Sequence, residues 1–229
     1  MERLRYSRQL YTCLFEAQSA GETCFDPLLF HFPTDDMTFK NTEESFIFAN
    51  ALKISPVLVS GSKTVTTYFP AGSWVSMKDY SVLTATGQKL DVPVQSDVAI
   101  AHLMPGAIVT KQMGNFMTTS DLSANNFTMI ANRDTNSQAS GTLYLDDGVS
   151  LSQAYDYLEF QLSAKSFKKW QKGTSNATKS LDSLIITNAA DLATTDFACY
   201  TSQADHSVTM LAATYIKTSG AETLTIKTT

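Results

Sequence analysis

Residues that would mark a specialised class of protein are scarce in this sequence. Its 229 residues include 3 cysteines, 6 prolines and 10 glycines, and only 17% of them are charged. A disordered chain and a collagen-like repeat are excluded, because 43% of the residues are hydrophobic and no internal repeat of fixed period is present. We therefore expect an ordered chain with one large or two small domains.

Positive charge and long hydrophobic runs are scarce too. The 17 Lys and Arg residues face 22 Asp and Glu residues, which gives a net charge of -5. Arg3, Arg5 and Arg8 gather near the start, but no basic stripe continues them, so a nucleic acid partner and an anionic membrane surface are excluded. Runs such as Ile47–Ile54 contain polar residues and fall short of the roughly 20 apolar residues that a membrane span needs.

The three cysteines, Cys13, Cys24 and Cys199, are an odd number without CxxC spacing. This pattern indicates neither a disulfide framework nor a zinc site. Reduced, buried thiols are the favoured interpretation, and the sequence leaves the pairing of the three residues open.

The sequence gives two opposed indications of compartment. The first eight residues carry charges where a signal peptide would need an apolar stretch, which by itself predicts a cytosolic protein. Two N-glycosylation sequons, at Asn126 and Asn176, point instead to a secretory route.

One helix is predicted, over residues 3–20, and Gly21 follows where a C-terminal cap belongs. Its apolar residues form a broad stripe that no second helix of the chain covers. The stripe comprises Leu4, Leu10, Tyr11, Leu14, Phe15 and Ala17.

After Pro27 the pattern changes to short apolar or alternating segments separated by turn residues, which predicts strands. All six prolines lie in residues 27–105, so we place a boundary between two β units near 106–114. Strands at this spacing, without helices between them, predict antiparallel sandwiches. Residues 165–183 are polar and Lys-rich, and a loop is predicted there. The predicted strands are 28–32, 46–48, 54–59, 65–69, 73–76, 99–109, 127–131, 142–145, 157–162, 184–187, 197–201, 208–216 and 224–226.

Candidate catalytic groups are few. His31, His102 and His206 lie far apart in predicted strands and are interpreted as structural. The acidic pairs Asp35-Asp36 and Asp146-Asp147 follow turn signals, where carboxylates satisfy backbone donors and point apart, whereas a glycosidase pair must face one another across ~5 to 10 Å. No catalytic, cofactor-binding or metal-binding residue is predicted.

Aromatic side chains could form a platform for sugars, although core packing is their commoner use in short strands. Only Trp170, within Phe-Lys-Lys-Trp-Gln-Lys, has a setting polar enough for an exposed ring. Trp170 is therefore the candidate glycan contact. The aromatic residues weighed are Tyr68, Phe69, Trp74, Tyr80, Tyr144, Tyr155, Tyr157 and Trp170.

Collinear sequence blocks over residues 3 to about 165 closely resemble the final part of glycoside hydrolase family 31, the lysosomal-type α-glucosidases. The last sixty residues match only in the rhythm of their strands. The blocks are Arg5-Tyr-Ser, Leu10-Tyr-Thr-Cys-Leu-Phe-Glu-Ala, Gly21-Glu-Thr, Asp26-Pro-Leu-Leu-Phe-His-Phe-Pro-Thr-Asp-Asp36, Lys53-Ile-Ser-Pro-Val-Leu-Val59, Tyr68-Phe-Pro-Ala-Gly-Ser-Trp74, His102-Leu-Met-Pro-Gly-Ala-Ile108 and Gly141-Thr-Leu-Tyr-Leu-Asp-Asp-Gly-Val-Ser-Leu151.

The resemblance implies a mostly β fold with two consecutive antiparallel β-sandwich domains, preceded by one amphipathic helix left over from a (β/α)8 barrel. Residues 1–40 would be the last helix and closing segment of that barrel, 41–112 the proximal C-terminal β domain, and 113–229 the distal one. The family's nucleophile and acid/base aspartates lie upstream of the resembling segment and have no matching position here.

Several charged positions of the family differ in this chain. Asp26 stands where the family usually has Arg before Pro-Leu, Met104 replaces the Arg of HLRxG, and Val149 replaces the Glu of DDGES. These departures indicate a divergent member.

The resemblance predicts a catalytically inert C-terminal part of an α-glucosidase-like protein, whose parent activity is the retaining hydrolysis of α-glucosidic bonds. Its partner would be the catalytic barrel, or another chain, covering the helix Leu4 to Ala17. The runner-up is a stand-alone carbohydrate-binding or interaction module for α-glucan or maltose-type sugars. A longer parent implies a lysosomal or secreted protein, and a true start at Met1 implies a cytoplasmic one.

Overall fold

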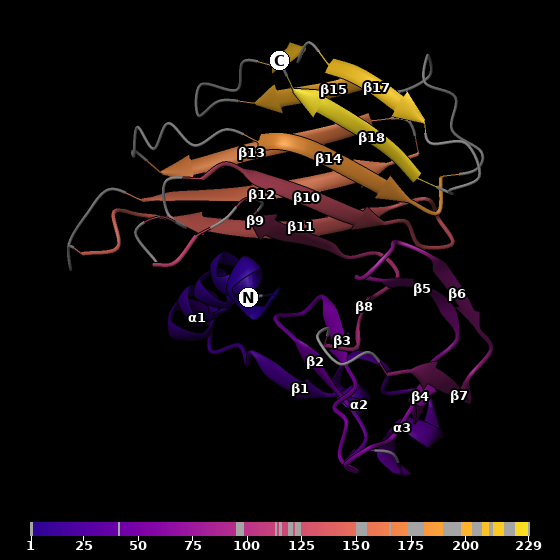
Figure 1. The fold of residues 1–229 in the computed structure, drawn as a ribbon. Helices are drawn as coiled ribbons and strands as arrows, with labels where there is room; N and C mark the ends of the chain where they lie inside the picture. The colour runs from indigo at the N-terminus through magenta and orange to yellow at the C-terminus, as the bar shows by residue number, and fades with distance from the viewer. Residues whose placement is uncertain are drawn as a thin grey trace.

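The computed structural model describes residues 2–40, 42–94, 99–112, 114, 116–118, 121, 125–149, 155–164, 166–173, 181–189, 198–202, 208–210, 213–217 and 223–228. An N-terminal helix is followed by β-sheets that stack above and beside it (Figure 1). The predicted fold class, mostly β with one leading helix, is confirmed.

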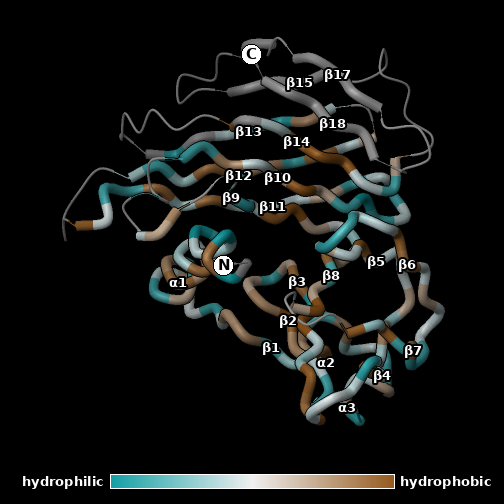
Figure 2. Tube along the Cα trace, in the orientation of Figure 1, coloured by the Kyte–Doolittle hydropathy of each residue, from teal (hydrophilic) through white to brown (hydrophobic). Residues whose placement is uncertain are grey.

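The predicted helix at residues 3–20 is confirmed, with a tighter first turn. A 3-10 turn, η1 (Glu2–Tyr6), leads into α1 (Ser7–Ala20). Gly21 adopts the left-handed conformation (φ 77°), and its N–H bonds to the Ala17 carbonyl (3.0 Å). In Figure 2, α1 carries both teal and brown segments, because polar and apolar residues alternate along it.

The strand predicted at 28–32 is wrong, since these residues form the short helix α2 (Leu28–His31). Pro27 precedes it with φ −64°, and the Phe32 N–H bonds to the Leu28 carbonyl (3.0 Å), closing one turn. This turn buries Leu28 in the core and leaves Phe30 62% exposed, which an apolar run alone could not reveal. A second short helix, α3 (Asp36–Lys40), follows.

The proximal unit is an antiparallel six-stranded sheet in the order β1-β2-β3-β8-β5-β6, with the pair β4-β7 beside it. Tyr68, Phe69 and Trp74 are fully buried between the sheet and this pair. The strands are β1 (Phe25–Pro27), β2 (Phe46–Phe48), β3 (Leu52–Ile54), β4 (Thr64–Phe69), β5 (Gly72–Ser76), β6 (Val82–Ala85), β7 (Gln88–Pro93) and β8 (Ala101–Leu103).

The distal unit has two five-stranded sheets, ordered β17-β18-β14-β10-β9 and β11-β12-β13-β15-β16. Most pairs are antiparallel, but β10 pairs with β14 and β13 with β15 in parallel. The strands are β9 (Ile108–Gln112), β10 (Phe127–Asn132), β11 (Ala139–Leu145), β12 (Asp156–Ser163), β13 (Ser166–Gly173), β14 (Leu181–Thr187), β15 (Ala198–Ser202), β16 (Val208–Met210), β17 (Ala213–Lys217) and β18 (Thr223–Thr228).

The prediction of a loop at 165–183 is wrong, because most of the described part of this segment is strand β13. Phe167 points into the core and is 1% exposed, while Lys168, Trp170 and Lys172 occupy the alternate positions on the outer face. Phe167 is the residue of β13 that joins the distal core, and the otherwise Lys-rich composition of the segment resembles that of a loop.

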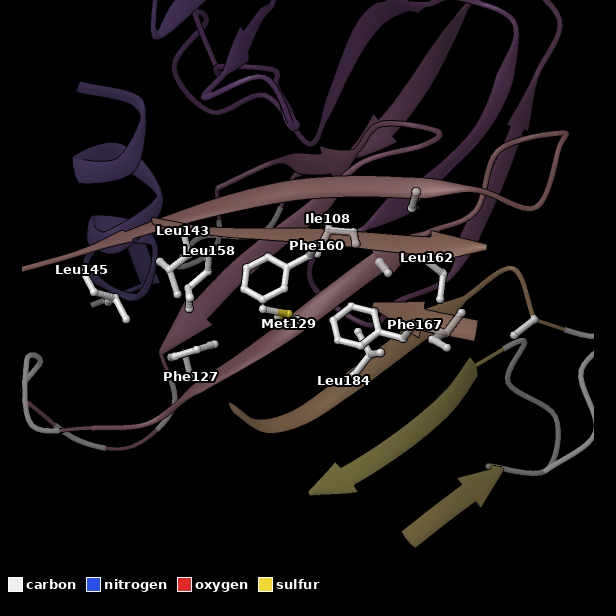
Figure 3. Packing of buried hydrophobic residues seen from close by; sticks show 14 residues of the cluster. Ile108, Phe127, Met129, Leu143, Leu145, Leu158, Phe160, Leu162, Phe167 and Leu184 are labelled. Carbon is white, nitrogen blue, oxygen red and sulfur yellow. The ribbon is translucent and has the colours of Figure 1, made fainter. Parts of the chain in front are cut away.

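The distal core lies between the two sheets, where apolar side chains of β9 to β14 meet (Figure 3). Alternate residues of β10 divide between two cores. Met129 and Ala131 face this distal core, and Ile130 faces a second cluster with Val75 and Leu103 of the proximal unit. All residues of β9 and β10 are therefore buried, and the two units share an apolar interface.

The expectation of reduced thiols is wrong for two of the three cysteines, since Cys13 and Cys24 form a disulfide with a Cα–Cα distance of 5.7 Å. The left-handed turn at Gly21 reverses the chain and brings the start of β1 back to the inner face of α1. Both cysteines are buried against Ala49. Cys199 lies on β15, and its side chain is outside the described part of the structure.

Candidate functional site

Helix α1 packs against the edges of both distal sheets, on strands β9 and β11 (Figure 1). Gln9 Oε1 accepts hydrogen bonds from the Thr110 N–H (3.2 Å) and hydroxyl (3.0 Å), and the Thr12 hydroxyl accepts one from the Tyr144 N–H (2.9 Å). An exposed strand edge carries unpaired N–H groups, and these polar side chains satisfy them.

Next to these contacts, α1 holds a cluster of aromatic rings. Phe15 stacks on Tyr144 with 4.0 Å between centroids and also contacts Tyr157 (5.8 Å). Glu16 Oε1 accepts hydrogen bonds from the Tyr157 hydroxyl (2.7 Å) and the Thr142 hydroxyl (2.6 Å). Burial, followed by the bond to Glu16, raises the pKa of Tyr157 above its usual value, so this tyrosine stays a hydrogen-bond donor.

A cleft of about 840 Å³ opens beside this cluster. Its walls are α1, the turn between β2 and β3, and the outer face of the sheet β11-β12-β13. Glu16 lines the helix wall, Asn50 the turn, and Trp170 the sheet. Aromatic and polar side chains converge in this cleft, which makes it the candidate functional site.

The sheet wall has a regular arrangement that follows from strand alternation. Tyr157, Glu159 and Gln161 alternate along β12 with Leu158, Phe160 and Leu162, which face the core. Trp170 stands directly opposite Glu159, so its half-buried indole lies beside that carboxylate on the outer face.

The carboxylates around the cleft have partners within the protein. Glu159 pairs with Lys172, whose strand position lies opposite Tyr157. Glu22 Oε2 accepts a hydrogen bond from the Asn50 amide (3.1 Å). These contacts place acceptors and donors at the rim while offsetting part of the negative charge.

A second surface feature lies on the other side of α1. Leu4 and Leu14 are 44% and 51% exposed. An apolar cavity of about 300 Å³ lies between the helix and the proximal sheet. Leu10 and Phe25 line this cavity. The predicted apolar stripe is therefore divided: Phe15 is covered by the distal unit, while Leu4 and Leu14 are left open.

The predicted turn positions of the acidic pairs agree with the structure. Asp35 accepts hydrogen bonds from the Met37 N–H (3.0 Å) and the Tyr68 hydroxyl (2.7 Å) at the start of α3. Asp146 and Asp147 each accept a backbone N–H two residues on, at 3.0 and 3.1 Å, in the turn after β11. These carboxylates therefore have structural partners.

Two histidines have structural surroundings as well. His31 Nε2 lies 3.1 Å from Asp26 Oδ2. Asp26, which differs from the family pattern, is thus paired inside the chain. His102 is 4% exposed on β8. His206 lies outside the described residues.

One of the two predicted sequons lies within the described residues. Asn126 is exposed just before β10. Asn176 falls outside the part of the chain that the structure describes.

The sequence singled out Trp170 and offered Tyr157 only among the aromatic residues weighed for a sugar platform. It gave no signal for Glu16 or Glu159, which share the cleft. The alternation along 157–162 was visible and did predict a strand, but it did not tell which strand or helix would face it. Within the described ranges, no group of three or more His, Cys, Asp or Glu side chains is placed to hold a metal ion. The described helices are also too short or too polar to cross a membrane.

Comparison with known proteins identifies the fold. Residues 21–109 match the family model "Glycosyl hydrolase family 31 C-terminal domain". A probable α-glucosidase of Oryza sativa subsp. japonica is 35% identical over 154 residues, covering 66% of this chain and 17% of the relative. The lysosomal α-glucosidase of Mus musculus is 31% identical over 169 residues, covering 65% and 18%. The chain thus spans less than a fifth of the length of these relatives.

Solved structures extend the similarity to nearly the whole fold. A chain in the crystal structure of an ER glucosidase II heterodimeric complex, which consists of the catalytic subunit and the binding domain of the regulatory subunit, matches 99% of this chain and 26% of its own. The TM-score is 0.83 at 16% identity. A Flavobacterium johnsoniae GH31 dextranase complexed with glucose matches 99% of this chain and 32% of its own, with a TM-score of 0.66 at 17% identity.

Proposed function

Because this chain carries the C-terminal domain of glycoside hydrolase family 31, we propose that it is the non-catalytic C-terminal part of an α-glucosidase-like protein and supports a catalytic (β/α)8 barrel. In this proposal the segment 1–40 closes the barrel, and the proximal and distal β domains predicted at 41–112 and 113–229 follow it. The sheets adjust both bounds, because β1 (Phe25–Pro27) pairs in the proximal sheet and β9 (Ile108–Gln112) pairs in a distal one. The parent activity is the retaining hydrolysis of α-glucosidic bonds by two carboxylates of the barrel.

The observation that carries this proposal is the uncovered apolar side of α1. The helix turns Gln9, Thr12 and Glu16 toward the distal unit and leaves Leu4 and Leu14 exposed. Its residue Leu10 lines the separate apolar cavity of about 300 Å³. Each large apolar side chain would contribute about 1.5–3 kcal/mol on full burial, so a covering partner gains from this surface.

A chimera tests the role of this surface. The chain replaces the matching segment of the rice relative, and the variant Leu4→Lys/Leu14→Lys is compared with Ser19→Lys, which adds a charge at an exposed position of α1 outside the open stripe. The double variant is expected to lower both the midpoint of thermal unfolding and the α-glucosidase activity, while Ser19→Lys changes neither. Equal activity and stability of all three chimeras would contradict the proposal.

The isolated chain provides a second test. Purified alone, it is expected to release no glucose from maltose or from a chromogenic α-glucoside. Turnover that stays constant per mole of chain through successive purification steps would overturn the non-catalytic assignment.

We also propose that the chain matures in an oxidising, secretory compartment. The buried Cys13–Cys24 disulfide supports this, since such bonds form and persist in secreted, lumenal and cell-surface proteins. The exposed Asn126 sequon agrees with the same route.

A further inference from the structure

We propose that the 840 Å³ cleft between α1, the β2–β3 turn and the outer face of β11-β12-β13 binds a neutral oligosaccharide, with the Trp170 indole as its stacking platform. The residues that line this site all belong to the chain itself, so sugar binding can be measured without the barrel. A chain that supports a barrel without binding sugar would therefore disprove only this proposal.

Shape and lining define the class of ligand. The cleft has the volume of a small-molecule site, and it is open to solvent along one side rather than enclosed. Its sheet wall presents two aromatic rings. Trp170 lies on β13 opposite Glu159 of β12, and Tyr157 lies two residues before Glu159 on the same face of β12. A pyranose ring has apolar C–H groups on its faces and hydroxyls around its edge, so it matches an aromatic wall with a polar rim.

The charges that line the cleft narrow the class of ligand further. Glu16, Glu22 and Glu159 surround the cleft against one cation, Lys172, so a phosphorylated or carboxylated ligand is disfavoured. The three carboxylates receive hydrogen bonds from Tyr157 and Thr142, from Asn50, and from Lys172, respectively. Their remaining oxygen lone pairs can accept hydrogen bonds from the hydroxyl groups of an uncharged polyhydroxyl ligand.

The protein also holds these groups in position before a ligand arrives. Both hydrogen bonds to Glu16 end on Oε1, which leaves Oε2 for a sugar hydroxyl. Strand register places Glu159 opposite Trp170, and Glu159 forms an exposed ion pair with Lys172. Side chains already fixed lose little conformational freedom on binding, which favours affinity in a site without a deep pocket.

Trp170 provides its own spectroscopic probe. The chain has two tryptophans, and Trp74 is 0% exposed with its indole N–H bonded to the Pro70 carbonyl (2.9 Å). Quenching of fluorescence by acrylamide therefore reports Trp170. Maltotriose bound at the cleft is expected to protect this fluorescence, with a dissociation constant on the order of 1 mM.

The test combines titration calorimetry and acrylamide quenching on the full chain with maltotriose and with an α-mannotriose. These probes distinguish an α-glucan from a glycoprotein glycan, and saturable, Trp170-protecting binding of either supports the proposal. Trp170→Ala is expected to weaken binding at least tenfold, and Trp170→Phe to retain part of it.

The matched control is Lys168→Ala, which lies on the same face of β13 two residues away and does not line the cleft. It should bind like the unaltered chain. A second variant, Glu159→Gln, keeps a planar hydrogen-bonding group beside Trp170 and should weaken binding less than Trp170→Ala. Absence of binding to both sugars, or binding that leaves Trp170 unprotected and survives Trp170→Ala in a folded protein, would overturn the proposal.

Discussion

At the scale of single residues, Lys53 is an unusual feature of the proximal unit. Its side chain is 0% exposed, and its ammonium donates hydrogen bonds to the hydroxyls of Ser55 and Thr67, both at 2.8 Å. The Phe69 ring lies 4.1 Å away. Burial lowers the pKa of Lys53 to about 7, because these neutral partners only partly replace hydration.

Lys53 should make stability rise with pH above neutrality. Its folded pKa lies below the unfolded value of 10.5, so between pH 7 and about 10 the unfolded chain binds more protons and the free energy of unfolding increases with pH. Relative to Lys53→Met, the unaltered protein should gain up to about 1 kcal/mol per pH unit over that range in urea denaturation. A difference between the two proteins that is constant with pH would disprove this.

His102 lies opposite Lys53 in the pairing of β3 with β8. Its titration should also make the free energy of unfolding rise with pH, but in a more acidic range. Burial and the nearby Lys53 lower the pKa of His102 to about 4. The unfolded chain binds the extra proton between pH 4 and about 6.5, so stability should fall as the solution is acidified through this range. Lys53→Met should reduce this effect, since it removes one of the two causes.

At the scale of elements, α1 acts as a cover for two strand edges. At one end of the distal sandwich β9 and β11 touch directly, through the bridge between Ala107 and Ser140. A Cβ on Gly141 would lie only 2.5 Å from the Ile108 carbonyl oxygen, so this approach requires glycine. Farther along the strands, α1 takes the place of the missing strand partner.

Thr12 tests this edge-covering role. Thr12→Val keeps the shape of the side chain but leaves the part-buried Tyr144 N–H without its acceptor, and should lower the free energy of unfolding by about 1–3 kcal/mol. Thr12→Ser retains the hydroxyl and should restore slow hydrogen exchange at the Tyr144 amide. Equal exchange rates for the Val and Ser variants would contradict the assignment.

The disulfide ties the same helix to the proximal sheet. Cys13→Ala/Cys24→Ala should lower the free energy of unfolding by about 2–3 kcal/mol, because the closed loop of Cys13–Cys24 restricts the unfolded chain. Urea denaturation with and without reductant measures the effect. Reductant should destabilise the unaltered protein and leave the double variant unchanged; a variant as stable as the oxidised protein would refute the prediction.

At the scale of the whole molecule, the proximal and distal units are joined by a shared core rather than by a linker alone. Val75, Leu103 and Ile130 belong to one buried cluster, and the Asn132 amide of β10 donates hydrogen bonds to the Ser73 and Leu103 carbonyls at 2.7 and 3.1 Å. The two units should therefore unfold together.

The proposed secretory route predicts that the chain is N-glycosylated. Expressed through a eukaryotic secretory pathway, it should carry an N-glycan at Asn126, which is exposed ahead of β10. Asn126→Gln should remove one glycosidase-sensitive mass increment, with Asn176→Gln measured separately. Thr128 is unsuitable as the altered position, because its hydroxyl contacts Ser183 (3.0 Å) in the sheet. An unmodified Asn126 peptide would count against the secretory proposal.

Much of the fold could be predicted because local rules decide it. The helix at 3–20, the cap at Gly21 and the turns at Asp35 and Asp146 depend on residues near in sequence. The predictions were wrong where contacts between distant residues decide the secondary structure. Residues 28–31 form a helix that buries Leu28, and 166–173 form a strand because Phe167 packs in the core. Glu16 and Glu159 were missed for the same reason.

By itself, the sequence determined the β-rich composition, the leading helix and the resemblance to family 31, since periodicity and motif order survive in one dimension. Tertiary structure alone decided the Cys13–Cys24 bond, the burial of Lys53, and the meeting of Glu16 with Trp170 across more than a hundred residues. The physical reason is that burial, redox pairing and site geometry depend on which surfaces come together, and that is set by packing between elements distant in the chain.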